Sequence, residues 1–365
     1  MQITHIETLL HGDKVAAVRV RTDTGHEGIG QTACHGADLT VAALHKLIAP
    51  IFLGADPWDV GALVERAMRQ NYKYNGTIKC RALCGVETAV WDLLGKLTGQ
   101  PVYKLLGGAV RDRVPLYASS LSRLITPEQE AERMREAVRR YGFRCVKIKI
   151  GGRMSRDADA WPGRTERIVP LMREALGPDI AISADANGSY TPAKAIQVGR
   201  LLERHSYFHF EEPCPYDEPE NTRIVADALD IPVAGGEQDW DLRTFKRLID
   251  TRTVDVVQFD VGYIGGISRA RRVAELAELA GVVCTPHCSN HSLLQIFTLH
   301  LAAAMPACSQ FQEYRLDDDA PWAETIYTPM PAVVDGQLPL PTRPGWGVEL
   351  QPAFVAAAEK RSSTR

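Results

Sequence analysis

From Val114 onward, the chain places ionisable residues at the ends of short apolar runs, where a structural core would not select them. Lysines, acids and a histidine recur in this position, one small group per run. Together they offer bases, carboxylate ligands for a cation and a carboxylate–imidazole pair, which is a set suited to proton transfer. They are Lys147-Ile148-Lys149, Asp185-Ala186-Asn187, Glu211-Glu212-Pro213, Glu237, Asp260, His287 and Glu313.

Lys147 and Lys149 are two residues apart, so on a strand both side chains point to the same side. Two ammonium groups held close together disfavour each other's charge, which predicts a lysine pKa lowered towards neutrality. A lysine tuned in this way can act as a general base. The alternative is that Lys-x-Lys forms the solvated face of an edge strand.

Asp185, Glu211 and Glu237 supply one carboxylate from each of three successive apolar runs. Three converging carboxylates repel one another unless a cation lies between them. Hard oxygen ligands favour Mg²⁺, which keeps positions open for water and substrate. The alternative is that the three acids are unrelated strand caps or members of separate ion pairs.

Asp260 and His287 close two neighbouring apolar runs. A carboxylate beside an imidazole fixes its tautomer and raises its basicity. Glu313 is predicted either to hydrogen-bond a substrate carboxylate while protonated or simply to cap the final run. His291 and His300 are predicted to be packed histidines, since His300 lies inside the helical run 293–304.

Bases on opposite walls with a cation between them can remove the proton from the carbon next to a carboxylate. That proton is very weakly acidic in water, so the enediolate that forms must be stabilised, and a divalent cation does this strongly.

The elements that must position these residues form a regular alternation. Eight short β-branched or apolar runs are separated by amphipathic helical segments, and Thr126-Pro127 with Gln129 predicts a capped helix that ends at Gly142. Thr191-Pro192 predicts another helix start of the same kind. The expected strands are 114–118, 145–150, 180–184, 207–210, 233–235, 254–259, 282–285 and 309–312.

This rhythm predicts an α/β fold, a (β/α)7-8 TIM-type barrel, in which the carboxyl ends of the strands meet at one site. A doubly wound sheet is the alternative, and the absence of a glycine-rich phosphate loop after any strand argues against it. Before the barrel, a hairpin over 15–30 and a helix over 81–95 predict an α+β capping domain. The expected division is 1–112 for the capping domain, 113–315 for the barrel and 316–365 for a segment that packs back on the cap.

Composition excludes several classes of function. The 365 residues carry a formal net charge of −3, so no basic field exists to attract nucleic acid or an anionic membrane. No apolar stretch is long enough to span a bilayer, and the first residues lack the pattern of a signal peptide. The eight cysteines are scattered, and the spacings Cys80-x-x-x-Cys84 and Cys284-x-x-x-Cys288 lie in apolar segments, which favours reduced thiols in a cytoplasmic protein over zinc ligands.

The combined motifs resemble those of the enolase superfamily, specifically its mandelate racemase subgroup, over nearly the whole chain. The resemblance rests on Lys-x-Lys, Asp-x-Asn, Glu-Glu-Pro, Gly-Glu, an Asp followed by Ile264-Gly265-Gly266, and Pro286-His287. It implies that Asp185, Glu211 and Glu237 bind Mg²⁺ and that Lys149 is one acid/base. It further implies that His287 with Asp260 is the other, with Glu313 assisting charge development on the substrate. Asp260 stands where the muconate-lactonising and dipeptide-epimerase branches carry a lysine.

The resemblance favours the dehydration of an acid sugar, with a racemase or epimerase of a 2-hydroxy acid as the alternative. A non-catalytic metal-binding barrel is a more distant alternative. Substrate contacts are expected from polar residues of loops in both domains, and a homo-oligomer is expected because the family commonly forms them. The candidate contacts are His35, Tyr72, Asn75, Arg153, Asn187 and Asn290.

Overall fold

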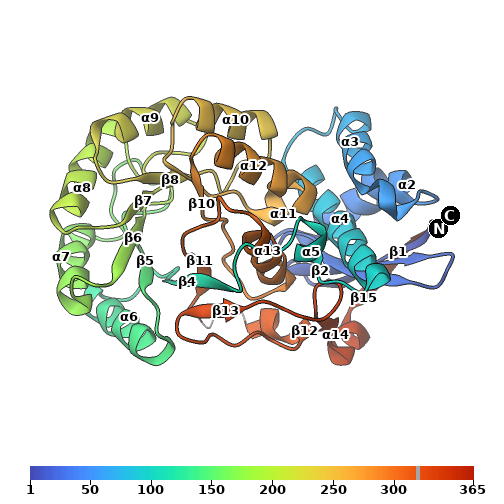
Figure 1. Ribbon diagram of the computed structural model, residues 1–365. Helices are drawn as coiled ribbons and strands as arrows, with labels where there is room; N and C mark the ends of the chain where they lie inside the picture. Colours follow the sequence, from blue (N-terminus) through green and yellow to red (C-terminus); the bar gives the residue numbers. More distant parts are fainter. Residues whose placement is uncertain (318–320) are drawn as a thin grey trace.

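The computed structural model describes residues 1–317 and 321–365. One end of the molecule is a four-stranded antiparallel sheet in the order β15-β1-β2-β3, on the right of Figure 1. The first and last strands of the chain are therefore neighbours in this sheet. Its strands are β1 (Ile3–His11), β2 (Val15–Thr22), β3 (Glu27–Gln31) and β15 (Glu359–Thr364).

Helices cover one face of this sheet, and the longest of them, α4 (Thr77–Thr98), is buried along most of its length. Gly28 and Gly30 of β3 allow the close approach, since a Cβ on Gly28 would lie 2.1 Å from the carbonyl oxygen of Ala89. The other helical segments here are α1 (Ala37–Ala43), η1 (Leu44–Ile48), α2 (Ala49–Phe52), η2 (Pro57–Asp59), α3 (Val60–Gln70) and α5 (Val102–Leu105).

The centre of the larger part is a curled sheet of eight parallel strands in the order β10-β9-β8-β7-β6-β5-β4-β11. This arrangement confirms the predicted TIM-type barrel with a capping domain. The strands are β4 (Arg113–Ser119), β5 (Cys145–Lys149), β6 (Ala181–Asp185), β7 (His209–Glu211), β8 (Val233–Gly235), β9 (Val256–Val257), β10 (Val283–Cys284) and β11 (Gln312–Arg315).

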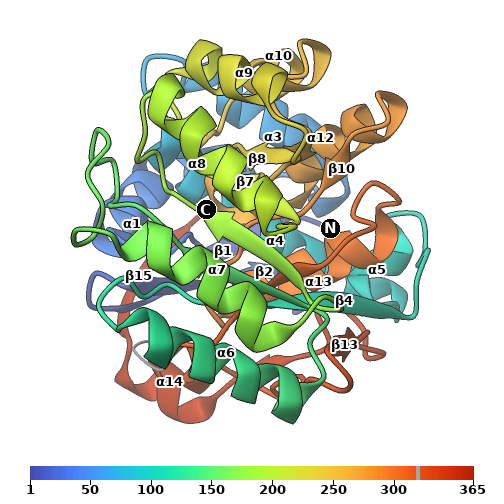
Figure 2. The ribbon, with the colours of Figure 1, turned by 90° about the vertical axis from the view of Figure 1, so that its left-hand side faces the viewer.

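Helices follow the strands and lie outside them, as the left side of Figure 1 and the rotated view of Figure 2 show. Their buried stripes pack on the apolar outer face of the strands, so the helices shield that face of the sheet from water. These helices are α6 (Pro127–Tyr141), α7 (Arg164–Leu176), α8 (Pro192–Arg204), α9 (Pro219–Ala228), α10 (Leu242–Asp250), α11 (Val261–Ile264), α12 (Ile267–Leu279) and α13 (Leu293–Ala304).

The last barrel strand differs from its prediction. The sequence pattern predicts a strand over 309–312, but the structure places β11 over Gln312–Arg315, where Glu313 pairs with Tyr117 of β4. Cys308 still donates its N–H to Met305 in the turn that ends α13, so the chain becomes extended only after this turn. Glu313 consequently lies within the strand rather than just after it.

Two predicted helix starts have different caps. Thr126 and Gln129 form the expected capping box, in which Gln129 N donates to Thr126 Oγ1 at 3.2 Å and Thr126 N donates to Gln129 Oε1 at 2.9 Å. At α8, Thr191 makes no such bond within its helix. Its N–H and hydroxyl instead donate to the carboxylate of Asp157, at 2.7 and 2.9 Å, from the loop after β5.

The C-terminal segment joins the two parts of the molecule. Trp346 is fully buried, and its indole N–H is 3.1 Å from the carbonyl oxygens of both Ile29 and Thr88. Trp346 and the pairing of β15 with β1 bring this segment into contact with the sheet and the long helix of the cap. Its elements are η3 (Pro321–Thr325), β12 (Tyr327–Thr328), β13 (Gln337–Pro339), β14 (Glu349–Leu350) and α14 (Pro352–Ala357).

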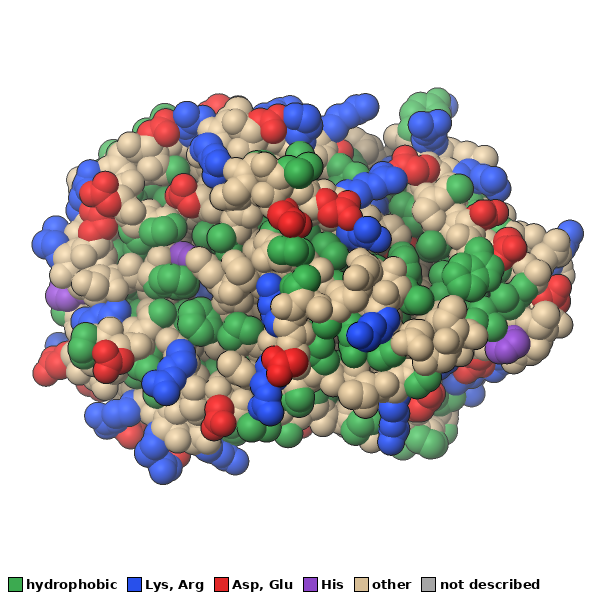
Figure 3. Space-filling view, viewed as in Figure 1, with side chains coloured by type: hydrophobic (Ala, Val, Ile, Leu, Met, Phe, Trp, Pro, Cys, Tyr) green, Lys and Arg blue, Asp and Glu red, His purple; other side chains and the backbone are tan. Residues whose placement is uncertain are grey.

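The surface in Figure 3 carries Lys and Arg interspersed with Asp and Glu rather than a patch of one sign. Within the described residues, no single helix has the length and apolar character to cross a membrane. Only the sharply bent pair 37–52 and 57–70, taken together at 114°, meets those two criteria.

Candidate active site

The carboxyl ends of β5, β6 and β7 bring the predicted residues side by side. Lys149 pairs with Asp185 across the first two strands, and Asp185 pairs with Glu211 across the next two. Because these strands are parallel and in register, their last side chains share one edge of the sheet. Lys147 and Lys149 are both almost fully buried, which rules out the alternative of a solvated edge strand.

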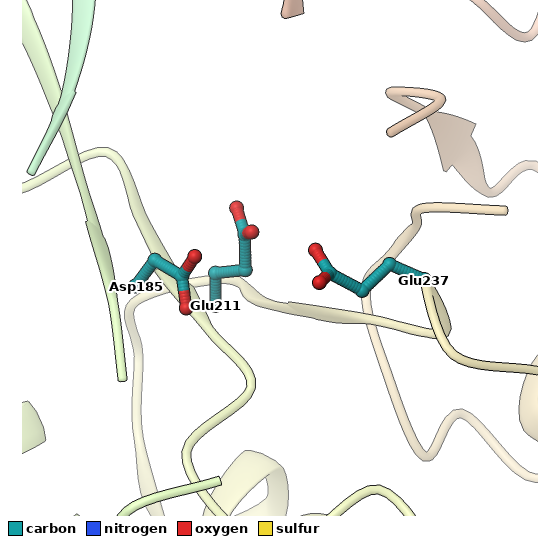
Figure 4. A group of neighbouring side chains, drawn as sticks. All are labelled: Asp185, Glu211 and Glu237. Atoms are coloured by element: carbon teal, nitrogen blue, oxygen red, sulfur yellow. The ribbon is translucent and has the colours of Figure 1, made fainter. Parts of the chain in front are cut away.

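Asp185, Glu211 and Glu237 converge, and Figure 4 shows the three carboxylates directed toward one another. One oxygen from each lies within 4.8 Å of the others, and all three side chains are buried. Each carboxylate is also oriented by a neighbour. Asn187 N donates to Asp185 Oδ1 at 2.8 Å, Gln258 Nε2 to Glu211 Oε2 at 2.8 Å, and Gln238 Nε2 to Glu237 Oε1 at 3.0 Å.

Three buried carboxylates at this spacing fit a divalent cation. Burial and the nearby charge of Asp185 raise the pKa of Glu211 to about 8. With only the protein's own charges present, an ionised Glu211 beside ionised Asp185 is therefore costly. A cation between the oxygens removes that cost. The donor set consists of hard carboxylate oxygens, which suits Mg²⁺ rather than a softer metal.

Each lysine of β5 makes ion pairs with these acids. Lys147 Nζ lies 2.7 Å from Glu211 Oε1 and 3.0 Å from Glu313 Oε1, while Lys149 Nζ donates to Asp185 Oδ2. Burial by itself would lower the pKa of Lys147, but the carboxylates of Glu211 and Glu313 outweigh it and hold that pKa well above its usual range. The predicted lowering of a lysine pKa is therefore wrong for Lys147, because acids rather than Lys149 dominate its surroundings.

Asp260 and His287 face each other across adjacent strand ends, where they form a parallel bridge. His287 Nδ1 is 2.7 Å from Asp260 Oδ2, and the other oxygen of Asp260 accepts from the backbone of Gly262 and Tyr263 at 2.6 and 3.0 Å. This arrangement leaves Nε2 of His287 directed away from Asp260. Burial opposes the charged imidazole, but Glu237, Glu313 and Asp260 together raise the pKa of His287 to about 10.

Glu313 is buried and fully engaged. Its Oε1 accepts from Ser119 Oγ at 2.7 Å, and its Oε2 accepts from Cys288 N at 2.9 Å. Burial favours the neutral acid, but Lys147 and His287 outweigh it and lower the pKa of Glu313 to about 2. An ionised carboxylate cannot donate a hydrogen bond, so this arrangement of charges disfavours the alternative in which a protonated Glu313 donates to the substrate.

A cavity of about 670 Å³ opens above these strand ends, between the barrel and the cap. It is in the size range of sites for small organic ligands. Lys149 and His287 both line it, together with Glu237. Of the predicted substrate contacts, the structure brings four to this cavity, which are His35, Arg153, Asn187 and Asn290.

The structure does not bring Tyr72 and Asn75 to the cavity. Both are exposed in the segment between α3 and α4, and the described residues around the cavity do not include them. Backbone hydrogen bonds from Tyr72 to Arg69 and from Tyr74 to Asn71 fold this segment as a turn beyond the end of α3. The predicted substrate contacts from this segment therefore have no support in the cavity geometry.

All eight cysteines are buried and free. Within residues 1–317 and 321–365, only Asp185, Glu211 and Glu237 group closely enough to hold a metal ion. His300 is packed as predicted, since it accepts from Tyr103 N through Nδ1 at 3.2 Å and donates from Nε2 to Trp346 O at 3.1 Å.

Several lining residues have no signal in the sequence. Lys14 and Asp13 reach the cavity from the turn between β1 and β2, and Tyr263 and Arg315 from the barrel. Glu212 also lines it, next to the predicted ligand Glu211. Its Oε1 is buried without a hydrogen-bond partner among the described residues. The Glu211-Glu212 pair in the sequence could have indicated that Glu212 also reaches the site. Asp13 and Lys14 could not be predicted in this way, because their position at the cavity depends on how the two domains meet.

Two families of known sequences match the chain in its two parts. The description "Mandelate racemase / muconate lactonizing enzyme, N-terminal domain" matches residues 4–107, and "Enolase C-terminal domain-like" matches residues 129–354. The chain is also 30% identical over 346 residues to the arabinonate dehydratase of Saccharolobus solfataricus, which covers 93% of this chain and 89% of that protein.

Solved structures match this chain along its full length. A protein from Roseobacter denitrificans, proposed as a racemase, is 44% identical with a TM-score of 0.97, and the match covers 100% of both chains. A mandelate racemase/muconate lactonizing protein from Paracoccus denitrificans, in complex with magnesium, is 29% identical with a TM-score of 0.90 over 100% of this chain and 99% of that one. From its two matched domains and its barrel-end constellation, the chain belongs to the mandelate racemase/muconate lactonizing enzyme family of the enolase superfamily.

Proposed function

We propose that the protein is a Mg²⁺-dependent dehydratase of acid sugars. The observation that carries this proposal is that Lys149 and His287 line the same cavity as Glu237 of the carboxylate group. Two acid/base groups and a cation site thus face one ligand space. The 30% identity to an arabinonate dehydratase supports the same reaction class.

In the proposed reaction, one of the two groups takes the proton from carbon 2 of the substrate. The electron pair of that C–H bond moves onto the carboxylate and gives an enediolate. The other group then gives a proton to the hydroxyl on carbon 3, whose C–O bond breaks to release water. The enol that results tautomerises to a 2-keto-3-deoxy acid, and the configuration of the substrate decides which residue takes the first proton.

Asp185, Glu211 and Glu237 would hold Mg²⁺ in this proposal. The ion would supply positive charge to the substrate carboxylate as negative charge develops there. The protein's own contribution lies in orientation. Asp260 holds His287 so that Nε2 is the atom free to exchange a proton, and Lys147 binds Glu211 and Glu313 so that both carboxylates keep fixed positions.

A racemase or epimerase is the second candidate. Lys149 comes from β5 and His287 follows β10, and β5 lies on the far side of the curled sheet from β10. Bases on opposite walls can exchange the proton on the two faces of one carbon. The 44% identical protein proposed as a racemase favours the same possibility.

A library of aldonic and aldaric acids in D₂O with Mg²⁺ separates these functions. Semicarbazide detects 2-keto acids, and mass spectrometry detects deuterium at carbon 2. Keto acid formed from one acid of the library is the expected result. Deuterium uptake without keto acid would show that the protein is a racemase or epimerase and not a dehydratase. If no acid gives either signal while the protein still binds Mg²⁺, the result would favour the non-catalytic metal-binding barrel.

We also propose that residues 1–112, 113–315 and 316–365 act as the cap, the barrel and the segment that joins them. The two family matches, over 4–107 and 129–354, and the position of β15 in the sheet of the cap support this division.

A further inference from the structure

Cationic side chains gather where the cavity meets the cap. Besides Lys149 at the strand ends, the basic residues that line the cavity are Lys14, Arg153 and Arg315. The acids Glu212 and Glu237 belong to the strand ends with the metal site. Asp13 is then the remaining acid of the described lining, so three cationic groups face one carboxylate in this part of the cavity.

Lys14 is held in place by its backbone. It lies in the turn between β1 and β2, where its carbonyl oxygen accepts from His35 N at 3.3 Å and that of Asp13 accepts from Ala37 N at 2.9 Å. The turn is thereby fixed to the segment before α1. The ammonium group of Lys14 forms no ion pair with the residues that the structure describes, although the side chain lines the cavity.

Arg153 comes from the barrel, on a loop between β5 and α7 in which hydrogen bonds hold the residues on both sides of it. Met154 N donates to Asn187 O at 3.0 Å, Gly152 N donates to Ala158 O at 2.9 Å, and the carboxylate of Asp157 binds Thr191. A charged side chain on such a loop loses less freedom when it binds a ligand. Arg153, like Lys14, makes no ion pair within the described part of the chain.

The pKa of His35 is sensitive to the charges of the basic residues around the cavity. This histidine lines the cavity, and its partial removal from water lowers its pKa. Arg81, Arg315 and Arg153 lower that pKa further, against the single opposing charge of Asp13. Cations from the cap, the β5–α7 loop and β11 therefore act on one point of the cavity wall.

We infer that this region binds a second anionic group of the substrate, at the end away from the carboxylate that reacts. The inference rests on the proposed function and names its substrate class as an acid sugar with two anionic ends. The shared chemistry is that of the distal carboxylate of an aldaric acid or the terminal phosphate of a phosphorylated aldonic acid. Lys14 and Arg153 have no carboxylate partner among the described residues, so in this partly enclosed cavity they can stabilise such a group by charge-assisted hydrogen bonds.

The test compares an aldaric acid, the aldonic acid of the same configuration and the aldonic acid phosphorylated on its terminal carbon. For the wild-type protein with Mg²⁺ we expect kcat/KM for one of the two doubly charged acids to exceed that for the aldonic acid at least tenfold. Whichever doubly charged acid reacts identifies the group as carboxylate or phosphate. The double variant Lys14→Gln/Arg153→Gln should lose at least tenfold on that acid and less than threefold on the aldonic acid. Arg156→Gln, an exposed arginine of the same loop that does not line the cavity, is the matched control and should change neither.

Calorimetry on the Lys149→Ala/His287→Asn variant measures binding of the same three acids without turnover. Tighter binding of a doubly charged acid that weakens with Lys14→Gln/Arg153→Gln supports the inference even if no acid is dehydrated, in which case only the proposed reaction fails. Equal binding of all three acids, or a preference that the double variant retains, would overturn the inference and leave the dehydratase standing.

Discussion

Lys149 and His287 approach the cavity from opposite walls, and each is bound to a carboxylate that fixes its position. Lys149 donates to Asp185, and His287 is held by Asp260 at 2.7 Å. The same residue types in a core would be expensive to bury, since an unpaired charge loses its hydration. Here each charge has a partner and faces a space in which a substrate carboxylate and a cation can join it.

Loss of either acid/base group should remove most of the activity. For Lys149→Ala and for His287→Asn we expect kcat on the true substrate to fall about 100- to 10,000-fold, the usual contribution of a general acid or base. Deuterium exchange at carbon 2 should survive in at most one of the two variants, and that variant lacks the acid rather than the base. The surface variant Lys194→Ala should keep wild-type kinetics, and full activity in both site variants would refute the mechanism.

Mg²⁺ should stabilise the folded protein through the three carboxylates. A ligand present at 100 times its dissociation constant adds about 2.7 kcal/mol to the free energy of unfolding. We expect Mg²⁺ to raise the thermal midpoint of the wild type and to have little effect on Glu237→Gln. The exposed variant Glu166→Gln should respond as the wild type does. An equal Mg²⁺ response in all three proteins would show that the ion binds elsewhere.

For individual site residues, the sequence predicted those that end barrel strands and missed those whose position depends on how the cap docks. Asp185, Glu211 and Glu237 each close a recognisable apolar run, so parallel strand geometry alone placed them together. Lys14 lies in a polar turn like many others, and nothing in its neighbours indicates that the turn meets a barrel. The predicted contacts of Tyr72 and Asn75 failed to reach the cavity for the same reason, since a loop's direction depends on the docking of whole domains.

Among the elements, α4 and α12 are joined end-on by one buried carboxylate. Glu87 of α4 accepts from Ile267 N at 2.9 Å, from Ser268 N at 2.7 Å and from Trp91 Nε1 at 2.8 Å. Two of these donors are otherwise unsatisfied N–H groups at the first turn of α12, where the helix dipole also favours a negative charge. Gly266, at φ 103°, leaves room for the carboxylate, because a Cβ there would lie 2.2 Å from Glu87 Oε2.

Removing this carboxylate should weaken the contact between the cap and the barrel. For Glu87→Ala we expect the free energy of unfolding to fall by about 3 kcal/mol, because hydrogen bonds to a buried charge are lost and their donors stay buried. Glu87→Gln keeps one acceptor oxygen and should lose less. Denaturant unfolding measures both, and Glu65→Ala, on an exposed ion pair, is a control that should change little. An unchanged stability in Glu87→Ala would show that other contacts hold the domains together.

The sequence predicted element types more reliably than their ends. The pattern 81–95 predicted the middle of α4, whose observed bounds are Thr77–Thr98, and the strand predicted over 309–312 is shifted by three residues. The ends depend on tertiary contacts that periodicity does not contain. Thr191 illustrates this, since its expected local cap is replaced by Asp157 from another loop.

For the whole molecule, His300 links three separate parts of the chain. It lies in α13 of the barrel, accepts from Tyr103 in α5 of the cap, and donates to Trp346 of the C-terminal segment. Both ring nitrogens are used, so the neutral imidazole satisfies the site and the charged form does not. Burial lowers the pKa of His300 to about 4.

This histidine should make the fold sensitive to mild acid. An unfolded chain protonates His300 below a pH of about 6.5, whereas the folded protein resists protonation until about 4. The unfolded state therefore binds the extra proton, and stability falls as pH decreases between these values, by about 3 kcal/mol in total. We expect His300→Gln to be less stable at pH 7 but to lose less stability between pH 7 and pH 4.5 than the wild type. Parallel curves for the two proteins would contradict this assignment.

The pairing of β15 with β1 has a consequence for synthesis of the chain. Until residues 359–364 leave the ribosome, β1 presents a row of unpaired backbone groups at the edge of its sheet, and such an edge is a template for pairing with another chain. At cellular elongation rates this exposure lasts roughly 20 to 70 s. The strand that ends it is Glu-Lys-Arg-Ser-Ser-Thr, so the edge finally shown to other molecules is charged and polar. The nascent chain thus passes through an interval in which chaperone protection of β1 matters most, and that interval closes only when residues 359–364 have emerged and paired with β1.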